Sequence, residues 1–375
     1  MKLSVIIVSY NVRYYIEQCI NSVERATKNI DTEIFVVDNN SEDHTVKYLR
    51  KRFGKRIELI ESSHNLGFAR ANNKAIHLST GEYILFLNPD TFVGENSISQ
   101  VLEFMDNHPE TGGVGVRMHN ADGSYASESR RSIPTPFVSL LKMLGFSRRY
   151  YMSRLSWEKP EQIEIISGAF CMVCRSVIEK VGLLDKDYFM YGEDIDFSYR
   201  ILQGGFQNWF VPANILHYKG ESTQKSSFRY VHVFYQAMII FFRKHYGHLS
   251  LFITLPIHIA IYLRAFMALI AMQYTKTGKS LGFGYGSDKS LQYCFVGSNA
   301  MLGECRKLAR RKGLDASFCR ELSEISECDI VVYDIDGKFT FEEILAHAHQ
   351  HAGHFKIGTY SKYTHVLITP NEIIQ

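Results

Sequence analysis

Two kinds of hydrophobic pattern alternate along the first ninety residues. Short apolar runs rich in β-branched residues are typical of strands buried on both faces, and they predict strands at residues 3–9, 33–37, 56–60 and 83–87. Apolar positions at helical spacing lie between them and predict helices at residues 14–27, 41–52 and 67–78. The regular alternation of strand and helix predicts right-handed crossovers and therefore a doubly wound sheet.

The pattern becomes less regular after residue 100. Residues 117–131 are polar. Residues 134–151 mix apolar with basic side chains, which suggests a mobile loop that binds a substrate. Strands are predicted at 163–173 and 206–211, and helices at 176–181 and 193–203, the last ended by Gly204 and Gly205. The predicted core therefore extends beyond residue 200.

Residues 249–273 form the longest apolar segment, which is long enough to cross a bilayer. Arg264 near its middle makes a span costly, and basic residues flank both ends, so neither orientation is favoured. We interpret residues 229–277 as amphipathic, membrane-associated helices that lie in or dip into the cytoplasmic face. A single span and a plain buried helix remain the alternatives.

Residues 278–375 predict a small α/β unit after a linker rich in glycine and serine at 278–288. Phe295-Val296-Gly297-Ser298-Asn299 resembles the turn of a nucleotide-binding βα unit, but the full G-x-G-x-x-G is missing. A packing or interaction domain is therefore favoured over a second cofactor site.

Composition narrows the class of protein. With 375 residues, 46% apolar and 22% charged, the chain can build a packed core of one large and one smaller domain. A net charge of +3 gives no reason to expect nucleic acid as a partner. The seven cysteines are scattered, and Cys171 and Cys174 stand in an apolar run, so we predict buried strand rather than zinc. We see no signal peptide, and the cysteines suit a reducing cytoplasm.

Polar side chains follow several predicted strands. Tyr10, Asp38, Asn65 and Asp90 each come just after a strand end. In open α/β sheets ligands bind outside the carboxyl ends of the strands, so these four side chains should converge on one crevice.

Three short segments carry the candidate chemistry: Asp90, the pair Glu193-Asp194, and His217. A carboxylate at a strand end suits Mg²⁺ or Mn²⁺, and a carboxylate beside the aromatic run 187–191 suits a general base. Each also has an ordinary interpretation. Asn-Pro-Asp forms turns, acidic residues favour helix N-termini, and a lone histidine is usually structural.

The order of these motifs resembles family 2 inverting glycosyltransferases, and within them the rhamnosyltransferase-like branch that builds bacterial surface polysaccharides. The resemblance rests on six segments, in chain order: residues 4–11, 36–41, 65–73, 87–90, 168–170 and 192–200. It covers residues 3 to about 245 and leaves 281–375 uncovered.

This resemblance implies a GT-A-like mixed sheet and a role for each motif residue. Tyr10 and Asp38 would hold the nucleobase and ribose, and Gly67 and Arg70 would line the diphosphate side. Asp90 and His217 would bind Mg²⁺ or Mn²⁺. Asp194 would be the base, supported by Glu193. Asn88 stands where many relatives have an aspartate, which removes one charge from the metal site.

We therefore expect a GT-A glycosyltransferase domain at 1–228, membrane-associated helices at 229–277 and a small α/β domain at 278–375. The expected reaction is inverting transfer of a sugar, with rhamnose or another deoxyhexose as candidates, from a nucleotide diphosphate sugar. The acceptor would be a hydroxyl of a glycan or lipid-linked molecule, with Mg²⁺ or Mn²⁺ as cofactor.

The enzyme would work peripherally at the cytoplasmic face of the inner membrane, with the membrane surface as a partner. Residues before 249 should bind nucleotide without the rest of the chain. The alternatives are a sugar nucleotidyltransferase, which would need a glycine-rich basic loop after the first strand, and a non-catalytic membrane-bound scaffold.

Overall fold

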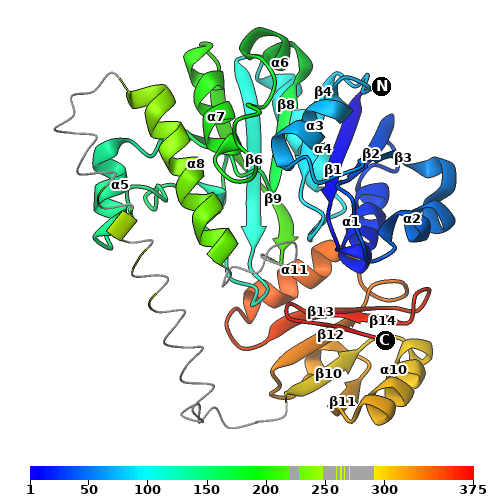
Figure 1. Cartoon of the computed structure of the whole chain (residues 1–375). Coiled ribbons are helices and arrows are strands. Elements are labelled where there is room, and N and C mark those ends of the chain that lie inside the picture. Colours follow the sequence, from blue (N-terminus) through cyan, green and yellow to red (C-terminus); the bar gives the residue numbers. More distant parts are fainter. Residues whose placement is uncertain (219–227, 248–258, 260–261, 264–265, 267–269, 271–290) are drawn as a thin grey trace.

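The computed structural model of the chain describes residues 1–218, 228–247, 259, 262, 263, 266, 270 and 291–375. Two α/β units stand side by side, each built on one sheet (Figure 1). The larger sheet has nine strands and the smaller has six. The expected α/β fold with a mixed main sheet is confirmed.

The large sheet has the strand order β3-β2-β1-β4-β8-β6-β9-β5, and β7 pairs with β9 outside this path. Its strands are β1 (Leu3–Ser9), β2 (Thr32–Asp38), β3 (Glu58–Glu61), β4 (Tyr83–Leu87), β5 (Thr91–Val93), β6 (Thr111–His119), β7 (Glu161–Ile163), β8 (Phe170–Cys174) and β9 (Gln207–His217). The half from β3 to β4 is parallel, as the alternation of strand and helix predicts, whereas β8 joins β4 antiparallel.

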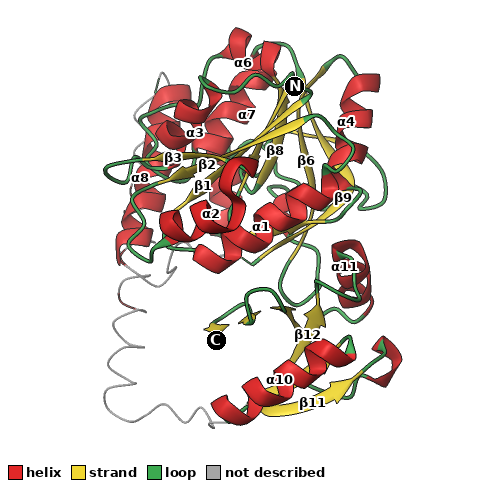
Figure 2. Cartoon of the chain, turned by 90° about the vertical axis from the view of Figure 1, so that its right-hand side faces the viewer, coloured by secondary structure: helices red, strands yellow, loops and turns green. Residues whose placement is uncertain are grey.

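Helices cover both faces of this sheet (Figure 2). The helices of the large unit are α1 (Arg13–Ala26), α2 (Thr45–Phe53), α3 (Phe68–Ile76), α4 (Ser97–Asn107), α5 (Pro136–Met143), α6 (Arg175–Val181), α7 (Glu193–Gln203) and α8 (Phe228–Tyr246), with short 3₁₀ turns at Gly54–Arg56 and Ser127–Ser129. Val5 and Ile7 of β1 point into the core under α1 and α4, and Ile6 and Val8 into the core under α3, α6 and α7. Both faces of β1 are buried, which is why Leu3 and all four positions from 5 to 8 are apolar.

Strand β9 is longer than its sequence indicates. The predicted strand ended at residue 211, just before Pro212, but β9 continues to His217. Its register against β6 shifts between the pairs Val116–Val211 and Arg117–Asn214, so Pro212 lies in a bulge. A proline that cannot donate to the ladder is tolerated at such a bulge, which is why it does not end the strand.

Helix α8 packs on the large domain, although the sequence places it with the membrane-associated helices. Ala237 and Phe241 are buried against Tyr188, and His245 Nε2 lies 2.7 Å from Asp196 Oδ1 of α7. The predicted boundary at 228/229 thus falls where a helix of the large domain begins.

Most of the apolar segment 249–273 lies outside the described residues. The five positions described there are helical and carry exposed side chains: Ile259, Tyr262, Leu263, Phe266 and Ile270. Among the helices that the structure describes, none combines the length and the hydropathy needed to span a bilayer.

The small unit is confirmed as α/β, with strand order β11-β10-β12-β13-β14-β15. Its elements are β10 (Gln292–Val296), α10 (Asn299–Lys312), β11 (Asp315–Cys319), a 3₁₀ turn (Leu322–Glu324), β12 (Ile330–Asp334), α11 (Phe341–Gln350), β13 (Lys356–Ser361), β14 (Val366–Ile368) and β15 (Ile373–Ile374). β11, β10, β12 and β13 are parallel, and the last two strands are antiparallel.

Helix α11 joins the two units and lies between their sheets in Figure 1. Phe341 is fully buried against Phe92, with ring centroids 4.7 Å apart. Glu95 accepts hydrogen bonds of 3.0 Å from the backbone N–H groups of Phe341 and Glu342 at the helix N-terminus. The small unit is therefore packed firmly against the large one.

Candidate functional site

A cavity of about 580 Å³ opens at the carboxyl ends of β1, β2 and β4. Tyr10, Asn65 and Asp90, which the sequence predicted to converge, all line it. Gly67, His217, Glu193 and Asp194 line it as well. Tyr10 and His217, which are 207 positions apart in the chain, thus face one space, because parallel strands present their carboxyl ends at the same edge.

Two of the expected nucleotide-binding residues do not line the cavity. Asp38 is 2% exposed, its Oδ2 accepts a 2.9 Å hydrogen bond from Ser41 N, and burial raises its pKa. Arg70 is exposed on α3, and its Nε lies 3.4 Å from Lys186 O. The neighbouring Asn39 forms the wall that Asp38 was expected to form.

Gly67 joins the two halves of the cavity. Its φ is +77°, and a Cβ at this position would lie 2.3 Å from the carbonyl oxygen of Phe189. The same oxygen accepts a 2.8 Å hydrogen bond from Phe68 N. Only glycine allows this approach, which sets the loop before α3 against the loop that leads into α7.

Asp90 and His217 form a pair at the base of the cavity. Thr91 of β5 is paired with His217 of β9, and this register brings Asp90 Oδ1 to 3.3 Å from His217 Nε2. The amide nitrogen of Asn88 lies 3.4 Å from the same ring nitrogen. Among the described residues no cluster of three or more histidine, cysteine or acidic side chains is arranged to hold a metal.

This pair nevertheless fits Mg²⁺ or Mn²⁺. Both ions accept carboxylate oxygen, and Mg²⁺ is often bound through only one or two carboxylates together with substrate phosphates and water. Asp90 is 1% exposed, so its carboxylate is fixed in place by the surrounding strands. A diphosphate would have to complete the coordination.

A strained turn aims the two carboxylates of α7. Tyr191 and Gly192 have φ values of +67° and +84°, and α7 begins at the next residue. A non-glycine residue in the left-handed region costs on the order of 1–3 kcal/mol and is most often kept at functional sites. The turn places Glu193 and Asp194 in the first turn of the helix, where the dipole favours negative charge.

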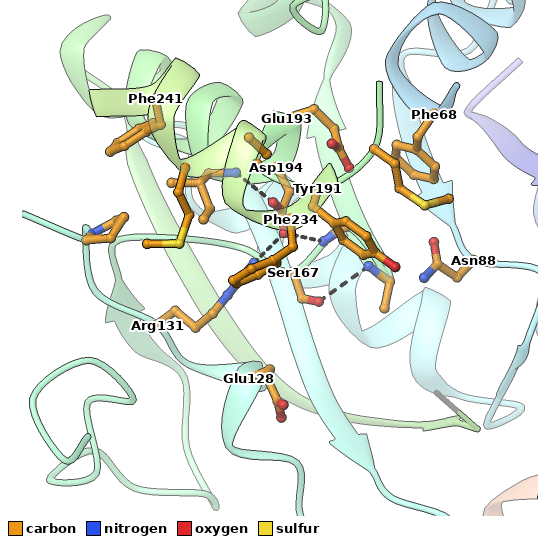
Figure 3. Close-up of a pocket in the computed structure, with 18 of the residues that line it drawn as sticks. Phe68, Asn88, Glu128, Arg131, Ser167, Tyr191, Glu193, Asp194, Phe234 and Phe241 are labelled. Atoms are coloured by element: carbon orange, nitrogen blue, oxygen red, sulfur yellow. Dashed lines mark hydrogen bonds and ion pairs between the residues drawn. The ribbon is translucent and has the colours of Figure 1, made fainter. Parts of the chain in front are cut away.

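Asp194 is held by an ion pair with Arg131 (Figure 3). Arg131 Nη2 lies 2.5 Å from Asp194 Oδ2, which also accepts a 3.2 Å hydrogen bond from Gly168 N. Arg131 Nη2 donates as well to Ile166 O at 2.8 Å. Burial alone would lower the pKa of Arg131, but Asp194 and Tyr150 raise it, so the cation persists. The carboxylate therefore has a fixed orientation.

Glu193 differs from the neighbouring Asp194 in its hydrogen bonding and its pKa. It is 6% exposed, and its Oε2 has no hydrogen-bond partner among the described residues. Burial, followed by the charge of Asp194, raises the pKa of Glu193 to about 8. At neutral pH Glu193 is therefore mostly neutral, whereas Asp194 forms the ion pair with Arg131.

The sequence did not identify Arg131. It stands in the polar stretch 117–131, next to a second arginine, and no motif marks it. It reaches Asp194 because the chain at Arg131 bridges to Ile165, just before the loop that leads into β8. Asn39 was also missed, although it directly follows the end of β2.

The opposite wall of the cavity is aromatic and basic. It is contributed by α5, the following loop and α8, through Ser139, Lys142, Tyr150, Tyr151, Phe234 and Phe241. Lys142 Nζ lies 3.5 Å from the centroid of Tyr150, and burial lowers its pKa to about 8. Stacking surfaces of this kind suit a sugar ring, and the cation suits an anionic group.

Residues 4–182 match the family model described as glycosyl transferase family 2. The chain is 27% identical over 259 residues to the N-acetylglucosaminyl-diphospho-decaprenol L-rhamnosyltransferase of Mycobacterium tuberculosis, covering 64% of this chain and 83% of that protein. It is 24% identical to the rhamnosyltransferase WbbL of Escherichia coli K12, over 60% of this chain and 91% of that protein.

Among solved structures, the chain is similar to the mannosyltransferase PcManGT from Pyrobaculum calidifontis in complex with GDP-Man and Mn²⁺. The TM-score is 0.47 at 18% identity, and the match covers 83% of this chain and 81% of that one.

Proposed function

Because the chain belongs to glycosyl transferase family 2, we propose that it transfers a sugar, with inversion at the anomeric carbon, from a nucleoside diphosphate sugar to a hydroxyl of a lipid-linked glycan. One observation carries this proposal. A fixed ionised carboxylate, Asp194, shares a cavity with a metal-compatible pair, Asp90 and His217. This arrangement provides a base for the attacking hydroxyl and a site for the leaving group.

The donor would lie along the carboxyl ends of β1, β2 and β4. Tyr10 offers a ring for the nucleobase, and Asn39 and Asn65 offer amide groups for the base and ribose. Asp38 supports this wall from behind, through the hydrogen bond that it accepts from Ser41 N. Gly67 leaves the backbone open toward the diphosphate.

In the transfer step, Asp194 accepts the proton of the acceptor hydroxyl. The acceptor oxygen then forms its bond to the anomeric carbon as the bond from that carbon to the diphosphate oxygen breaks, and the diphosphate leaves with the electron pair. Attack opposite the leaving group inverts the anomeric configuration. Arg131 keeps the Asp194 carboxylate aimed at the incoming hydroxyl.

When bound by Asp90 and His217, Mg²⁺ or Mn²⁺ would neutralise the charge that develops on the diphosphate. Neutral Glu193 lowers the negative charge at the site, so the departing diphosphate meets one anionic carboxylate fewer.

The relatives suggest the substrates. Two of them are named as rhamnosyltransferases, and the name of one specifies a diphospho-decaprenol acceptor. A deoxyhexose donor and an acceptor on a polyprenyl diphosphate follow as the first candidates, with the enzyme at the cytoplasmic face of the inner membrane. The aromatic wall with Lys142 is compatible with a sugar followed by an anionic group.

A panel of nucleoside diphosphate sugars tests the proposal. Each donor is first screened by the rise that it produces in the melting temperature of the full chain, with and without EDTA. Donors that bind are then incubated with a polyprenyl diphosphate sugar, and the anomeric configuration of the product is assigned by NMR. Transfer with retained configuration would refute the inverting mechanism, and the absence of transfer with every donor would refute the assignment of the acceptor.

A further inference from the structure

Helix α5 lies at the outer edge of the large domain (Figure 1) and carries an exposed apolar ridge. Its side chains are Phe137, Leu140, Leu144 and Phe146, which are 57%, 47%, 64% and 66% exposed. The first three recur at helical spacing and therefore lie on one side of the helix. Four large apolar side chains this close together and this exposed are unusual for a surface that stays in water.

The other side of α5 faces the catalytic cavity. Ser139 and Lys142 line that cavity, and Ser139 is only 5% exposed. An eight-residue helix thus separates the site of transfer from the apolar ridge.

Arginines border the ridge. Arg148, Arg149 and Arg154 line a second cavity of about 630 Å³ beside α5, in which Glu164 is the one acidic residue and accepts a hydrogen bond from Ile133 N. The Arg149 guanidinium lies 5.7 Å from the ring of Phe137. None of the ion pairs formed among the described residues involves these three arginines.

The chain segment that carries the ridge has charged side chains of a single sign. Residues 129–157 contain no aspartate or glutamate, while they carry six of the chain's lysines and arginines. A second copy docking through the same surface about a two-fold axis would bring these arginines against one another. An anionic lipid surface instead offers phosphates to the arginines and hydrocarbon to the ridge.

We propose that this α5 surface, made of Phe137, Leu140, Leu144, Phe146, Arg148, Arg149 and Arg154, docks the enzyme on an anionic lipid bilayer. The exposed side chains of Ile259, Tyr262, Leu263, Phe266 and Ile270 are a separate apolar group, and the α5 surface is independent of them. Its purpose rests on the proposed function, since a bilayer against α5 puts a lipid-linked acceptor one helix away from Asp194.

A site-specific probe tests the docking. In the full-length protein, Leu144→Cys is labelled with an environment-sensitive fluorophore, and Ser99→Cys on exposed α4 serves as the matched control. Phosphatidylcholine vesicles with and without phosphatidylglycerol are added, with no donor or acceptor present. We expect a blue shift at position 144 with the anionic vesicles and none at position 99.

Three results would overturn the proposal. In the first, the protein co-sediments with vesicles but the fluorophore at position 144 shows no blue shift. In the second, the blue shift appears without vesicles when the protein concentration is raised. In the third, the fluorophore is already in an apolar environment before vesicles are added. The second would indicate a self-interface, and the third would mean that the chain covers its own ridge.

Substitutions give a quantitative check. Leu140→Glu with Leu144→Glu should lower partition onto anionic vesicles by about tenfold or more, whereas Leu78→Glu, at an equally exposed leucine, should not. Arg148→Gln and Arg149→Gln should each lower partition onto anionic vesicles about fivefold and leave partition onto neutral vesicles unchanged. Unchanged partition in both sets would refute the docking surface, and turnover with a water-soluble acceptor would separate that failure from failure of the proposed function.

Discussion

At the scale of single residues, the cavity separates two neighbouring carboxyl groups by environment. Glu193 is buried and forms no ion pair with any described residue, whereas Asp194 is paired with Arg131 at 2.5 Å. Burial therefore keeps the first mostly neutral and the ion pair keeps the second oriented. The difference supports the proposal that Asp194 is the base and that Glu193 supports it.

Asp194→Asn should retain nucleotide binding and lose most turnover, by roughly 10²–10⁴-fold, because the amide cannot accept the proton. Turnover of a measured acceptor and donor binding by calorimetry give the two readouts. Glu179→Gln, an exposed carboxylate on α6, is the control and should keep both. Near-normal turnover in Asp194→Asn would mean that another group is the base.

Glu193→Gln should change how stability depends on pH. The folded-state pKa of Glu193 is raised to about 8 from an ordinary value of 4.5, so the native state holds the proton more tightly than the unfolded chain. Its contribution to the free energy of unfolding is complete below about pH 4.5 and is lost as the pH rises toward about 8. Gln mimics the neutral acid and cannot lose a proton.

Urea denaturation at a series of pH values between 5 and 8 checks this. The wild type should lose stability relative to Glu193→Gln as the pH rises. Parallel curves for the two proteins would show that Glu193 titrates normally in the folded state.

Asp90→Ala should weaken both divalent-ion affinity and metal-dependent binding of nucleoside diphosphate, and His217→Ala should do so less, because the carboxylate carries the charge. Titration calorimetry with and without metal measures both effects. His77→Ala, an exposed histidine at the end of α3, is the matched control. Unchanged metal-dependent binding in Asp90→Ala would exclude this residue as a ligand.

At the scale of elements, the turn before α7 fixes the direction of both carboxylates. A Cβ on Gly192 would lie 3.0 Å from Tyr188 and 3.3 Å from Ala237 of α8. Gly192→Ala should therefore combine backbone strain with a steric clash, destabilise the protein by about 2–3 kcal/mol and lower turnover by moving Asp194.

Gly313→Ala provides the matched control for this prediction. Gly313 also has a positive φ, +65°, but a Cβ there meets nothing within 4 Å. Gly313→Ala should lower the free energy of unfolding by only about 1–2 kcal/mol, the cost of placing alanine in the left-handed region, and should leave turnover intact. Equal losses of stability and full activity in both variants would show that the space around Gly192 is not restrictive.

The turn after β10 resembles a phosphate-binding turn, but a carboxylate of the protein itself occupies the place of the phosphate. Asp334 Oδ2 accepts hydrogen bonds from Ser298 N at 3.1 Å and from Ser298 Oγ at 2.5 Å. This carboxylate lies at the N-terminus of α10, where a phosphate would otherwise be favoured. The geometry supports a packing role for the small unit over a second nucleotide site.

At the scale of the whole molecule, the small unit stabilises the floor of the cavity. Phe341 packs on Phe92 of β5, and β5 carries the register that joins Asp90 to His217. The expectation that residues before 249 would bind nucleotide alone does not account for this packing, because the sequence gives no sign that α11 buries Phe92.

A chain truncated after residue 290 should therefore melt at a lower temperature and aggregate, because it exposes Phe92, Leu216 and Tyr218 to water. In the full chain, Phe341→Ala should cost about 3–5 kcal/mol, whereas Tyr363→Ala, 64% exposed, should cost little. Denaturation and light scattering measure these effects. A soluble truncated chain with wild-type stability would show that the small unit is dispensable for the fold.

The sequence by itself determined the parallel half of the large sheet and seven of the residues that face the cavity, namely Tyr10, Asn65, Gly67, Asp90, Glu193, Asp194 and His217. Those features are local. A β-branched run buried on both faces, or a polar side chain just after a strand, can be recognised from a few consecutive residues. The same reasoning failed at Pro212, where pairing with β6 absorbs the proline in a bulge and extends the strand to His217.

Only the tertiary structure decided what holds these residues in place. Arg131 meets Asp194 across 63 positions of sequence, and Phe341 meets Phe92 across 249. Neither contact leaves a periodic or spaced signal, because an ion pair or a buried ring needs only one residue from each segment. The state of Glu193 follows the same rule, since its pKa depends on burial and on the neighbouring charge, and burial exists only once the chain has folded.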